Sequence, residues 1–384
     1  MTIATGRRLE PRADVAHLAP AFGVYVHIPY CISRCPYCDF NTYVGIEDTA
    51  PEYIDAVLRE AAAHPRREAG SIFVGGGTPS LLQPSLMRRL LDGLRNTFDV
   101  TPGAEITIEA NPETVDVERL TAFRGAGVNR ISFGAQSFTP HILSMLGRAH
   151  TAERTEGAVR EARAAGFDNL NLDLIYGTPG ESLDDWRVSL ERAIALEPEH
   201  VSAYALTIEG GTQFGADVSS GRMPSPDDDD QADKYELALD LLADAGYEHY
   251  EISNWSKPDR ACRHNLVYWT QGEYAGLGAG AHGHRDGVRS WNEKAPRTYI
   301  ERAPDARAGD ETLDGPRRVQ EWLQLRLRLV AGLGIAEAER RTGRDLGPAI
   351  RELRSVGLLT TNGGRIEPTR RGMLLSSEIG ARLT

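Results

Sequence analysis

Short apolar runs rich in β-branched residues alternate with helical patterns along the first 250 residues. The apolar runs cover residues 24–29, 71–75, 105–110, 130–136, 169–177 and 200–209. Between and after them, apolar positions recur at i, i+3 and i+4 over residues 53–64, 83–98, 117–125, 152–165, 182–196 and 230–246. Strands that alternate with helices of this length predict parallel βαβ units. The predicted fold class is α/β, a (β/α)6 partial barrel of the TIM type. An open doubly wound sheet is the alternative, since spacing alone does not separate the two.

Polar residues at the ends of the predicted strands favour the barrel. A cysteine-containing loop follows the first strand, the segment GGGTP at 75–79 follows the second, and Glu109, Gln136 and Asp173 close the next three. In parallel α/β barrels the loops at the strand C-termini converge on one functional mouth. The alternative interpretation of Glu109 and Asp173 is that they are ordinary helix-capping or loop acids.

Changes in pattern divide the chain into four segments. Residues 1–19 are expected to form a disordered tail, and residues 20–247 the barrel. Residues 248–310, rich in glycine, histidine and aromatic side chains, lack a clear period and are interpreted as a connecting region. Residues 311–384 show three helical patterns, a hairpin with its turn at Asn362-Gly363-Gly364, and a last helix from Arg370. This is the element order of a winged helix, for which we expect a structural or partner-docking role.

Charge and composition narrow the class of protein. The formal net charge is −12, which disfavours nucleic acid as a partner because that binding depends on neutralising phosphates. No run approaches the roughly 18 consecutive apolar residues of a membrane span, and the first residues lack the apolar core of a signal peptide. Three of the four cysteines lie within eight residues, which indicates metal or redox chemistry in a reducing compartment. We therefore expect a cytoplasmic protein.

The spacing of Cys31, Cys35 and Cys38 (CX3CX2C) allows three thiolates from one loop to converge on one site. A structural zinc site normally takes four protein ligands, whereas a [4Fe–4S] cluster on three cysteines leaves one iron open for a small ligand. Zinc completed by Cys262 or His27 is the alternative.

This cysteine motif, followed by the glycine-rich second strand end, resembles the radical S-adenosylmethionine (SAM) superfamily. The resemblance implies that the open iron is chelated by the methionine part of SAM, and that an electron from the cluster cleaves SAM to a 5′-deoxyadenosyl radical. It also implies that Tyr37 lies against the adenine and that the loop at 75–79 contacts the methionine amino group.

Further motifs extend the resemblance over most of the chain. The segments YVHIP at 25–29, EANP at 109–112, SFGAQ at 132–136, LGR at 146–148 and NLDLIYG at 171–177 are similar to the oxygen-independent coproporphyrinogen III dehydrogenases. By this similarity the SAM-binding residues would be Tyr25, Gly76, Gly77, Thr78, Glu109, Gln136, Arg148, Asp173 and Thr207. Those dehydrogenases carry a fourth cysteine two residues after the third, where this chain has Phe40. This difference argues against oxidative decarboxylation of coproporphyrinogen.

The segment HNLVYW at 264–269 fits a pattern, HNXXYW, that resembles the signature of heme chaperones built on the radical SAM core. This resemblance implies heme as a further ligand, passed to acceptor hemoproteins of the respiratory chain. It is compatible with a homodimer and with peripheral membrane contact through the acceptor. An imidazole can ligate heme iron and aromatic rings can face a macrocycle, so the candidate heme contacts are His264, Tyr268, Trp269 and His282.

Three function classes follow from these observations. The first is a heme chaperone, the second a radical SAM enzyme acting on a porphyrinogen, and the third a zinc-stabilised winged-helix regulator, which the acidic charge disfavours. The alternative interpretation of the HNXXYW segment is that it forms a packed aromatic corner and binds no heme. Cys262 could attach heme covalently or be an ordinary core cysteine.

Overall fold

One large curved sheet forms the body of the protein in the computed structural model, which describes residues 14–383. Its twelve strands run in the order β12-β11-β10-β9-β1-β2-β3-β4-β5-β6-β8-β7. The central six are parallel, with bounds β1 Phe22–Ile28, β2 Glu68–Gly76, β3 Asp99–Ala110, β4 Arg130–Gln136, β5 Leu170–Tyr176 and β6 His200–Ala205. These six match the predicted strands, β6 being shorter than expected. They are buried runs, as expected for parallel strands covered on both faces.

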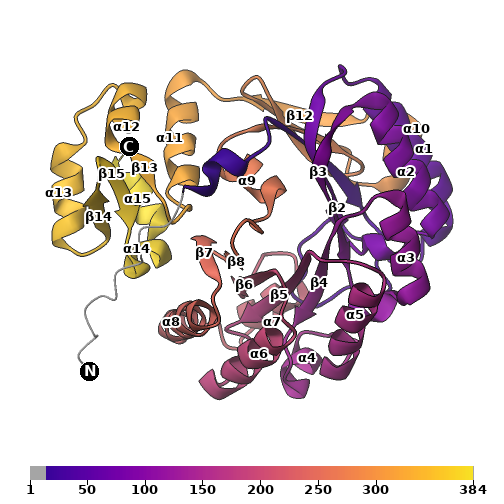
Figure 1. Ribbon diagram of the computed structural model, residues 1–384, viewed down its shortest axis with the longest axis horizontal. Coiled ribbons are helices and arrows are strands. Elements are labelled where there is room, and N and C mark those ends of the chain that lie inside the picture. Colours follow the sequence, from indigo (N-terminus) through magenta and orange to yellow (C-terminus); the bar gives the residue numbers. More distant parts are fainter. Residues whose placement is uncertain (1–13, 384) are drawn as a thin grey trace.

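Helices cover the convex side of the parallel strands, as Figure 1 shows. The six predicted helices are present as α1 Ala50–Ala62, α2 Pro84–Thr97, α3 Val117–Ala126, α5 Ala152–Ala164, α6 Leu183–Ala195 and α8 Asp228–Asp244. Local sequence fixes their ends. Asp116 caps α3 by accepting from the Arg119 N–H, and Ser182 with Asp185 forms a capping box on α6. Two short helices, α4 Pro140–Met145 and α7 Gln213–Ser219, lie in loops at the strand ends.

The order of the parallel strands decides between the two predicted architectures. Strands β1 to β6 follow one another in chain order without a reversal. A doubly wound sheet requires such a reversal, since its two halves are built outward from a central switch point. The (β/α)6 partial barrel is confirmed, and the doubly wound alternative is wrong.

The region predicted to connect two domains, residues 248–310, instead extends the main sheet at both edges. The pair β7 Glu248–Glu251 and β8 Asn254–Ser256 continues beyond β6, and β9 Glu273–Leu277 pairs in parallel with β1. An antiparallel set follows, with β10 His282–Arg285, β11 Val288–Asn292 and β12 Arg307–Thr312. Two helices accompany these strands, α9 Arg263–Trp269 and α10 Pro296–Arg302. The strands are too short for their alternation to stand out in the sequence.

Part of the segment expected to be a disordered tail is ordered. Val15–Leu18 forms a short 3-10 helix, η1, whose apolar side chains pack beside Tyr250, Leu266 and Leu329. Asp14 caps η1 and forms ion pairs with arginines of the C-terminal region. The expectation is therefore wrong for residues 14–19, because packing against distant segments orders them. Residues 1–13 lie outside the described residues.

The C-terminal segment has a hydrophobic core of its own, distinct from that of the barrel. Its elements are α11 Gly315–Arg326, β13 Leu333–Gly334, α12 Ile335–Thr342, α13 Gly347–Ser355, β14 Leu359–Asn362, β15 Arg365–Pro368, α14 Arg370–Leu374 and α15 Ser376–Leu383. Gly363 and Gly364, both with positive φ, form the predicted hairpin turn between β14 and β15. The three-stranded antiparallel sheet with its helices has the winged-helix order expected from the sequence.

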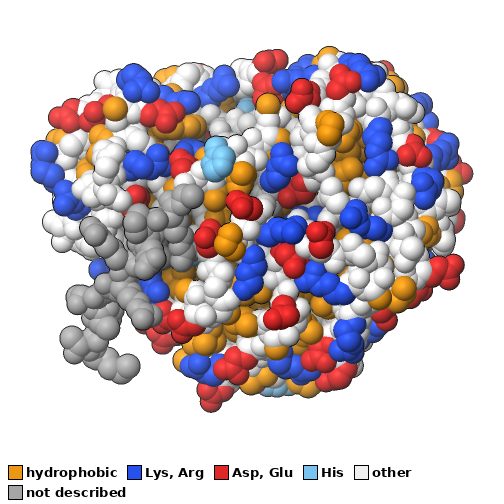
Figure 2. All heavy atoms as spheres, in the orientation of Figure 1, with side chains coloured by type: hydrophobic (Ala, Val, Ile, Leu, Met, Phe, Trp, Pro, Cys, Tyr) orange, Lys and Arg blue, Asp and Glu red, His pale blue; other side chains and the backbone are white. Residues whose placement is uncertain are grey.

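No helix in the described part of the chain combines the length and the apolar character needed to cross a bilayer. On the face drawn in Figure 2, acidic and basic side chains are interspersed rather than gathered into a patch of one sign.

Candidate functional site

A cavity of about 500 Å³ opens at the C-terminal ends of the parallel strands. Its wall includes the cysteine loop after β1, the glycine loop after β2 and side chains from the ends of β3 to β6. This is where the loops of an α/β barrel converge and where barrel proteins place their functional groups. The predicted candidates that line it are Cys31, Cys35, Tyr37, Cys38, Gly76, Gly77, Thr78, Glu109, Gln136, Arg148, Asp173 and Thr207.

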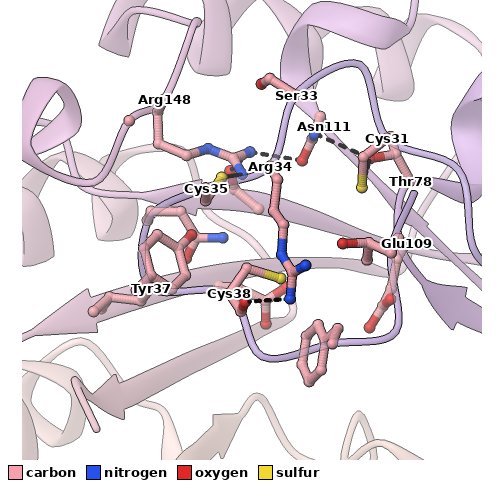
Figure 3. Close-up of a pocket in the computed structure, with 18 of the residues that line it drawn as sticks. Cys31, Ser33, Arg34, Cys35, Tyr37, Cys38, Thr78, Glu109, Asn111 and Arg148 are labelled. Atoms are coloured by element: carbon pink, nitrogen blue, oxygen red, sulfur yellow. Dashed lines mark hydrogen bonds between the residues drawn. The ribbon is translucent and has the colours of Figure 1, made fainter. Parts of the chain in front are cut away.

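The three clustered cysteines face this cavity from different sides, as Figure 3 shows. The Cys31 thiol shares a hydrogen bond of 3.5 Å with the Thr78 hydroxyl, and the Arg148 guanidinium donates to Cys35 Sγ at 3.6 Å. The Cys38 N–H donates to the Cys35 carbonyl, which turns the loop back on itself. Burial raises the pKa of the Cys31 and Cys38 thiols, so these groups need a bound cation to become thiolates at neutral pH.

The metal that the three thiols would hold depends on whether a fourth protein ligand lies near them. Among the described residues, no three His, Cys, Asp or Glu side chains lie close enough to hold one metal ion. The two residues proposed as the fourth zinc ligand, His27 and Cys262, interact with other groups instead. His27 bonds Tyr25 and the Asn41 carbonyl, and Cys262 lies against Glu105 near the other end of the strands. Neither residue is placed to complete a zinc site, which leaves a set of three thiols, the number that a [4Fe–4S] cluster with one open iron takes.

The glycine loop is fastened to the end of β1 so closely that side chains do not fit. The Gly77 N–H donates to the Ile28 carbonyl at 2.8 Å, and the Thr78 N–H donates to the Tyr30 carbonyl at 2.7 Å. A Cβ on Gly77 would lie 2.6 Å from the Tyr30 carbonyl oxygen. Gly76 has φ of 111°, which favours glycine. At Gly76 and Gly77 the loop thus presents backbone to the cavity, and Thr78 adds a hydroxyl beside Cys31.

Two carboxylates at the ends of β3 and β5 form the acidic part of the wall. Glu109 accepts a hydrogen bond of 2.8 Å from the Gly76 N–H, and Asp173 accepts from Ser132 Oγ and Asn171 Nδ2. Burial and the negative charge of Asp173 raise the pKa of Glu109 to about 8. A buried carboxyl held in this way would bind a cationic ligand readily, because the ligand's charge favours ionisation.

Arg148 and Gln136 are held in place by features that local sequence does not reveal. Arg148 Nη2 donates to Asn111 Oδ1 at 2.6 Å and to the Gly134 carbonyl at 3.1 Å. Gln136 has φ of 62°, at a register irregularity between β4 and β5. A non-glycine residue in this region of φ marks a site where the surrounding structure imposes the conformation.

Asn111 is a site residue that the sequence candidates omitted. It holds Arg148 through Oδ1 and reaches Thr78 Oγ1 through Nδ2 at 3.3 Å, so it links two of the predicted SAM contacts. It belongs to the same EANP segment as Glu109, which was the available signal.

Tyr37 and Tyr25 occupy different levels of the barrel. Tyr37 lines the cavity and packs toward Phe214, with ring centroids 6.3 Å apart. Tyr25 lies deeper and lines a second cavity of about 190 Å³ inside the barrel. Glu109, Ser132 and Asp173 border both cavities, so the interior chamber lies directly beneath the mouth.

The HNXXYW segment forms α9 on the inner side of the sheet, toward the N-terminal ends of the strands (Figure 1). His264 is 1% exposed, and its ring nitrogens bond Ser71 Oγ at 2.8 Å and the Tyr268 hydroxyl at 2.9 Å. Burial and the charge of Arg130 lower its pKa to about 3. With both nitrogens occupied, His264 does not offer a lone pair to a heme iron in this conformation. The residues at 264–269 act here as a packed aromatic corner.

The structure does not bring the four heme candidates together. Tyr268 contacts His264 and Tyr274, and Trp269 is partly buried in a cluster with η1, under the Arg328 guanidinium. His282 is exposed at the start of β10, where β9 ends at the mouth side of the sheet. Cys262 is fully buried beside Glu105, which contradicts covalent heme attachment at this thiol and makes it a core cysteine.

Two family models match the chain: the radical SAM superfamily over residues 25–193 and the HemN C-terminal domain over residues 313–375. Relatives similar over nearly the whole length are heme chaperones HemW. That of Mycobacterium tuberculosis is 42% identical over 93% of both chains, and that of Bacillus subtilis 32% identical over 92% of this chain and 97% of its own. The HemW of Escherichia coli is 42% identical over 77% of this chain and 81% of its own.

Among solved structures, the coproporphyrinogen III oxidase HemN of Escherichia coli, described as a radical SAM enzyme, is similar in fold. The comparison of the two structures gives a TM-score of 0.80 at 23% sequence identity, and it covers 95% of this chain and 90% of that chain. The likeness covers the barrel and the C-terminal segment alike.

Proposed function

This chain belongs to the HemW family of radical SAM proteins, and from that premise we propose that it is a heme chaperone that binds heme and delivers it to hemoproteins. The observation that carries the proposal is the 42% identity to a heme chaperone over 93% of both chains. The match spans the barrel, the extended sheet and the C-terminal segment, so it extends well beyond the cofactor cavity.

The cofactors in this proposal are a [4Fe–4S] cluster and SAM. Cys31, Cys35 and Cys38 would hold three irons of the cluster, and the cavity beside them is within the range of small-molecule sites. When bound, the pair supplies one-electron chemistry at an iron left open to SAM. Arg148, which donates to Cys35, offsets negative charge at this end of the cavity.

The protein's own groups would orient SAM from several directions. The glycine loop offers backbone to the methionine end, and Glu109 offers a carboxylate to a cationic group. Asp173 is aligned by Ser132 and Asn171, and Tyr37, Thr207 and Gln136 line the same cavity. Tyr25 lies below these contacts and would act through the interior chamber.

A porphyrinogen-oxidising enzyme is the alternative function. The similarity to HemN is a likeness of fold at 23% identity, and Phe40 occupies the position of the fourth cysteine of the coproporphyrinogen dehydrogenases. Phe40 is 61% exposed on the rim of the cavity. Its phenyl ring has no thiol with which to replace that cysteine. The side chain therefore gives no support to the enzymatic alternative.

The proposal includes a cytoplasmic location. The acceptors would be hemoproteins of the respiratory chain, and the protein would reach the membrane surface only by binding such an acceptor. It also allows a homodimer. The domain division is part of the proposal: a radical SAM barrel over residues 20–247, a region at 248–310 that here extends its sheet, and a C-terminal winged-helix-like unit from residue 311.

Two assays on anaerobically reconstituted protein test the proposal. Titration with heme should give a saturable Soret band, and incubation with an apo-hemoprotein should move that band to the acceptor. Turnover of coproporphyrinogen to protoporphyrinogen with SAM consumption, in the absence of stable heme binding, would refute the chaperone function.

A further inference from the structure

The proposed function requires a heme site, and a histidine that ligates heme iron must be accessible, which the enclosed His264 is not. All ten histidines lie in the described part of the chain. His27, His150, His200, His249, His264 and His284 are buried, and His64 is half-buried. Of the exposed three, His17 contacts the Asp14 carbonyl and His141 faces the Asp185 carboxylate. Within the described residues, His282 alone is exposed with ring nitrogens free of hydrogen bonds.

His282 stands on a flat aromatic platform formed by β10, β11 and β12. It is the cross-strand partner of Trp291, and the imidazole and indole centroids are 5.9 Å apart with planes inclined by 30°. Trp291 in turn pairs with Gly309 on β12, and a Cβ on that glycine would lie 2.6 Å from the indole ring. The indole therefore lies flat over the glycine. An imidazole that ligates a heme iron stands perpendicular to the macrocycle, so the exposed His282 ring would turn up from the indole plane, and the indole face would then lie toward the macrocycle.

The charge around His282 is complementary to a ligand with carboxylate groups. Lys294 is exposed and forms no ion pair among the described residues. Arg289, on the strand opposite, is paired with Glu321 and Glu311. Partial burial, together with the charges of Lys294 and Arg289, lowers the pKa of His282. The ring is thus neutral at physiological pH, as a metal ligand must be, and Lys294 is available for a propionate.

The platform adjoins the loop that carries the cluster cysteines. Asn41 Nδ2 donates to the Ala279 carbonyl at 3.0 Å and to the Lys294 carbonyl at 2.8 Å, and the Tyr43 hydroxyl donates to the Lys294 carbonyl at 3.1 Å. Two exposed apolar side chains flank these anchors: Phe40 (61% exposed) precedes Asn41, and Val44 (50% exposed) follows Tyr43. A macrocycle on the platform would lie beside the cavity mouth and leave the cavity itself for SAM.

We propose that heme docks on this platform, with His282 as an axial ligand to the iron, Trp291 against the ring face and Lys294 at a propionate. This site deepens the proposed function and rests on it. In this proposal α9 packs inside the barrel toward the N-terminal ends of the strands. Its HNXXYW residues do not touch heme; they stabilise the fold that carries the heme site.

The test is a heme titration of the cluster-loaded full chain and its variants, followed in the Soret region. His282→Ala should weaken heme binding by at least about 10–100-fold, the loss that removal of a mere outer-shell partner of a metal ligand already causes. It should also change the ferric Soret and EPR spectra, and free imidazole should restore the wild-type spectrum. Lys294→Glu should weaken binding several-fold, since it reverses the charge that meets the propionate.

Two matched controls make the result specific. His17→Ala removes an exposed histidine of η1 and should leave affinity and spectrum unchanged. His264→Ala should lower the thermal unfolding temperature, because it opens a buried hydrogen-bonded site, but the folded fraction should keep the wild-type heme spectrum.

Heme binding by His282→Ala with wild-type affinity and spectrum would overturn the platform site while leaving the chaperone function intact. Loss of the heme spectrum in folded His264→Ala protein would also overturn it. Failure of the wild-type protein to bind heme would instead refute the proposed function on which the site rests.

Discussion

Replacing Glu109 with glutamine should stabilise the ligand-free protein while weakening its binding of SAM. The pKa of Glu109 is raised from 4.5 in the unfolded chain to about 8 in the folded protein. Between these values the folded protein holds a proton that the unfolded chain has released, so stability falls as pH rises from about 4.5 to about 8. Linkage puts this loss at about 3 kcal/mol at pH 7 and about 1 kcal/mol at pH 5. Glutamine has no charge to bury, and its carbonyl can still accept from the Gly76 N–H.

Guanidinium unfolding of the cluster-free protein at pH 5 and pH 7 measures the effect. The Glu109→Gln variant should exceed the wild type by about 3 kcal/mol at pH 7, and the gap should narrow to about 1 kcal/mol at pH 5. Glu118→Gln, at an exposed position of α3, is the control and should show no gap at either pH. A Glu109→Gln variant no more stable than the wild type at pH 7, or a gap independent of pH, would refute the reasoning.

Three further substitutions test the cavity. Gly77→Ala should abolish SAM binding in calorimetry without loss of far-UV circular dichroism, because its Cβ would collide with the Tyr30 carbonyl; unchanged affinity would show that the loop does not touch the ligand. Cys262→Ser should retain the full iron content of the reconstituted protein, since this thiol lies at the other end of the strands; loss of iron would revive its role as a ligand. Asn111→Ala should keep its iron but lose about tenfold in SAM affinity, because Arg148 loses a charge-assisted hydrogen bond; equal affinity would contradict the positioning role.

The parallel core of the fold was predictable because its signals are local. A buried strand such as β1, Phe22–Ile28, is a mostly apolar run, and helices such as α6 carry both their period and their capping residues in the sequence. The edge strands β7 to β12 were not predicted, because strands of three to six residues are too short to show a readable alternation. Their pairing is decided by contacts with β1 and β6 that lie far away in the chain.

The candidate site shows the same division. The residues at the strand ends, such as Glu109 and Asp173, were placed by the geometry of parallel sheets, and they do meet in one cavity. The environment of His264 was not predictable from its motif, because Ser71 of β2 supplies one of its hydrogen bonds across 193 residues of chain. Asn111 was overlooked for a similar reason, since its role lies in a contact with Arg148, 37 residues away.

The most direct measurement of the central claim is low-temperature EPR of the anaerobically reconstituted and reduced protein, with and without SAM. Three cysteines around a cubane with one open iron predict a [4Fe–4S] signal whose g-values shift when SAM is added, and which disappears in the Cys31, Cys35 and Cys38 alanine variants. A signal unaffected by SAM, or iron retained when all three thiols are removed, would contradict the account.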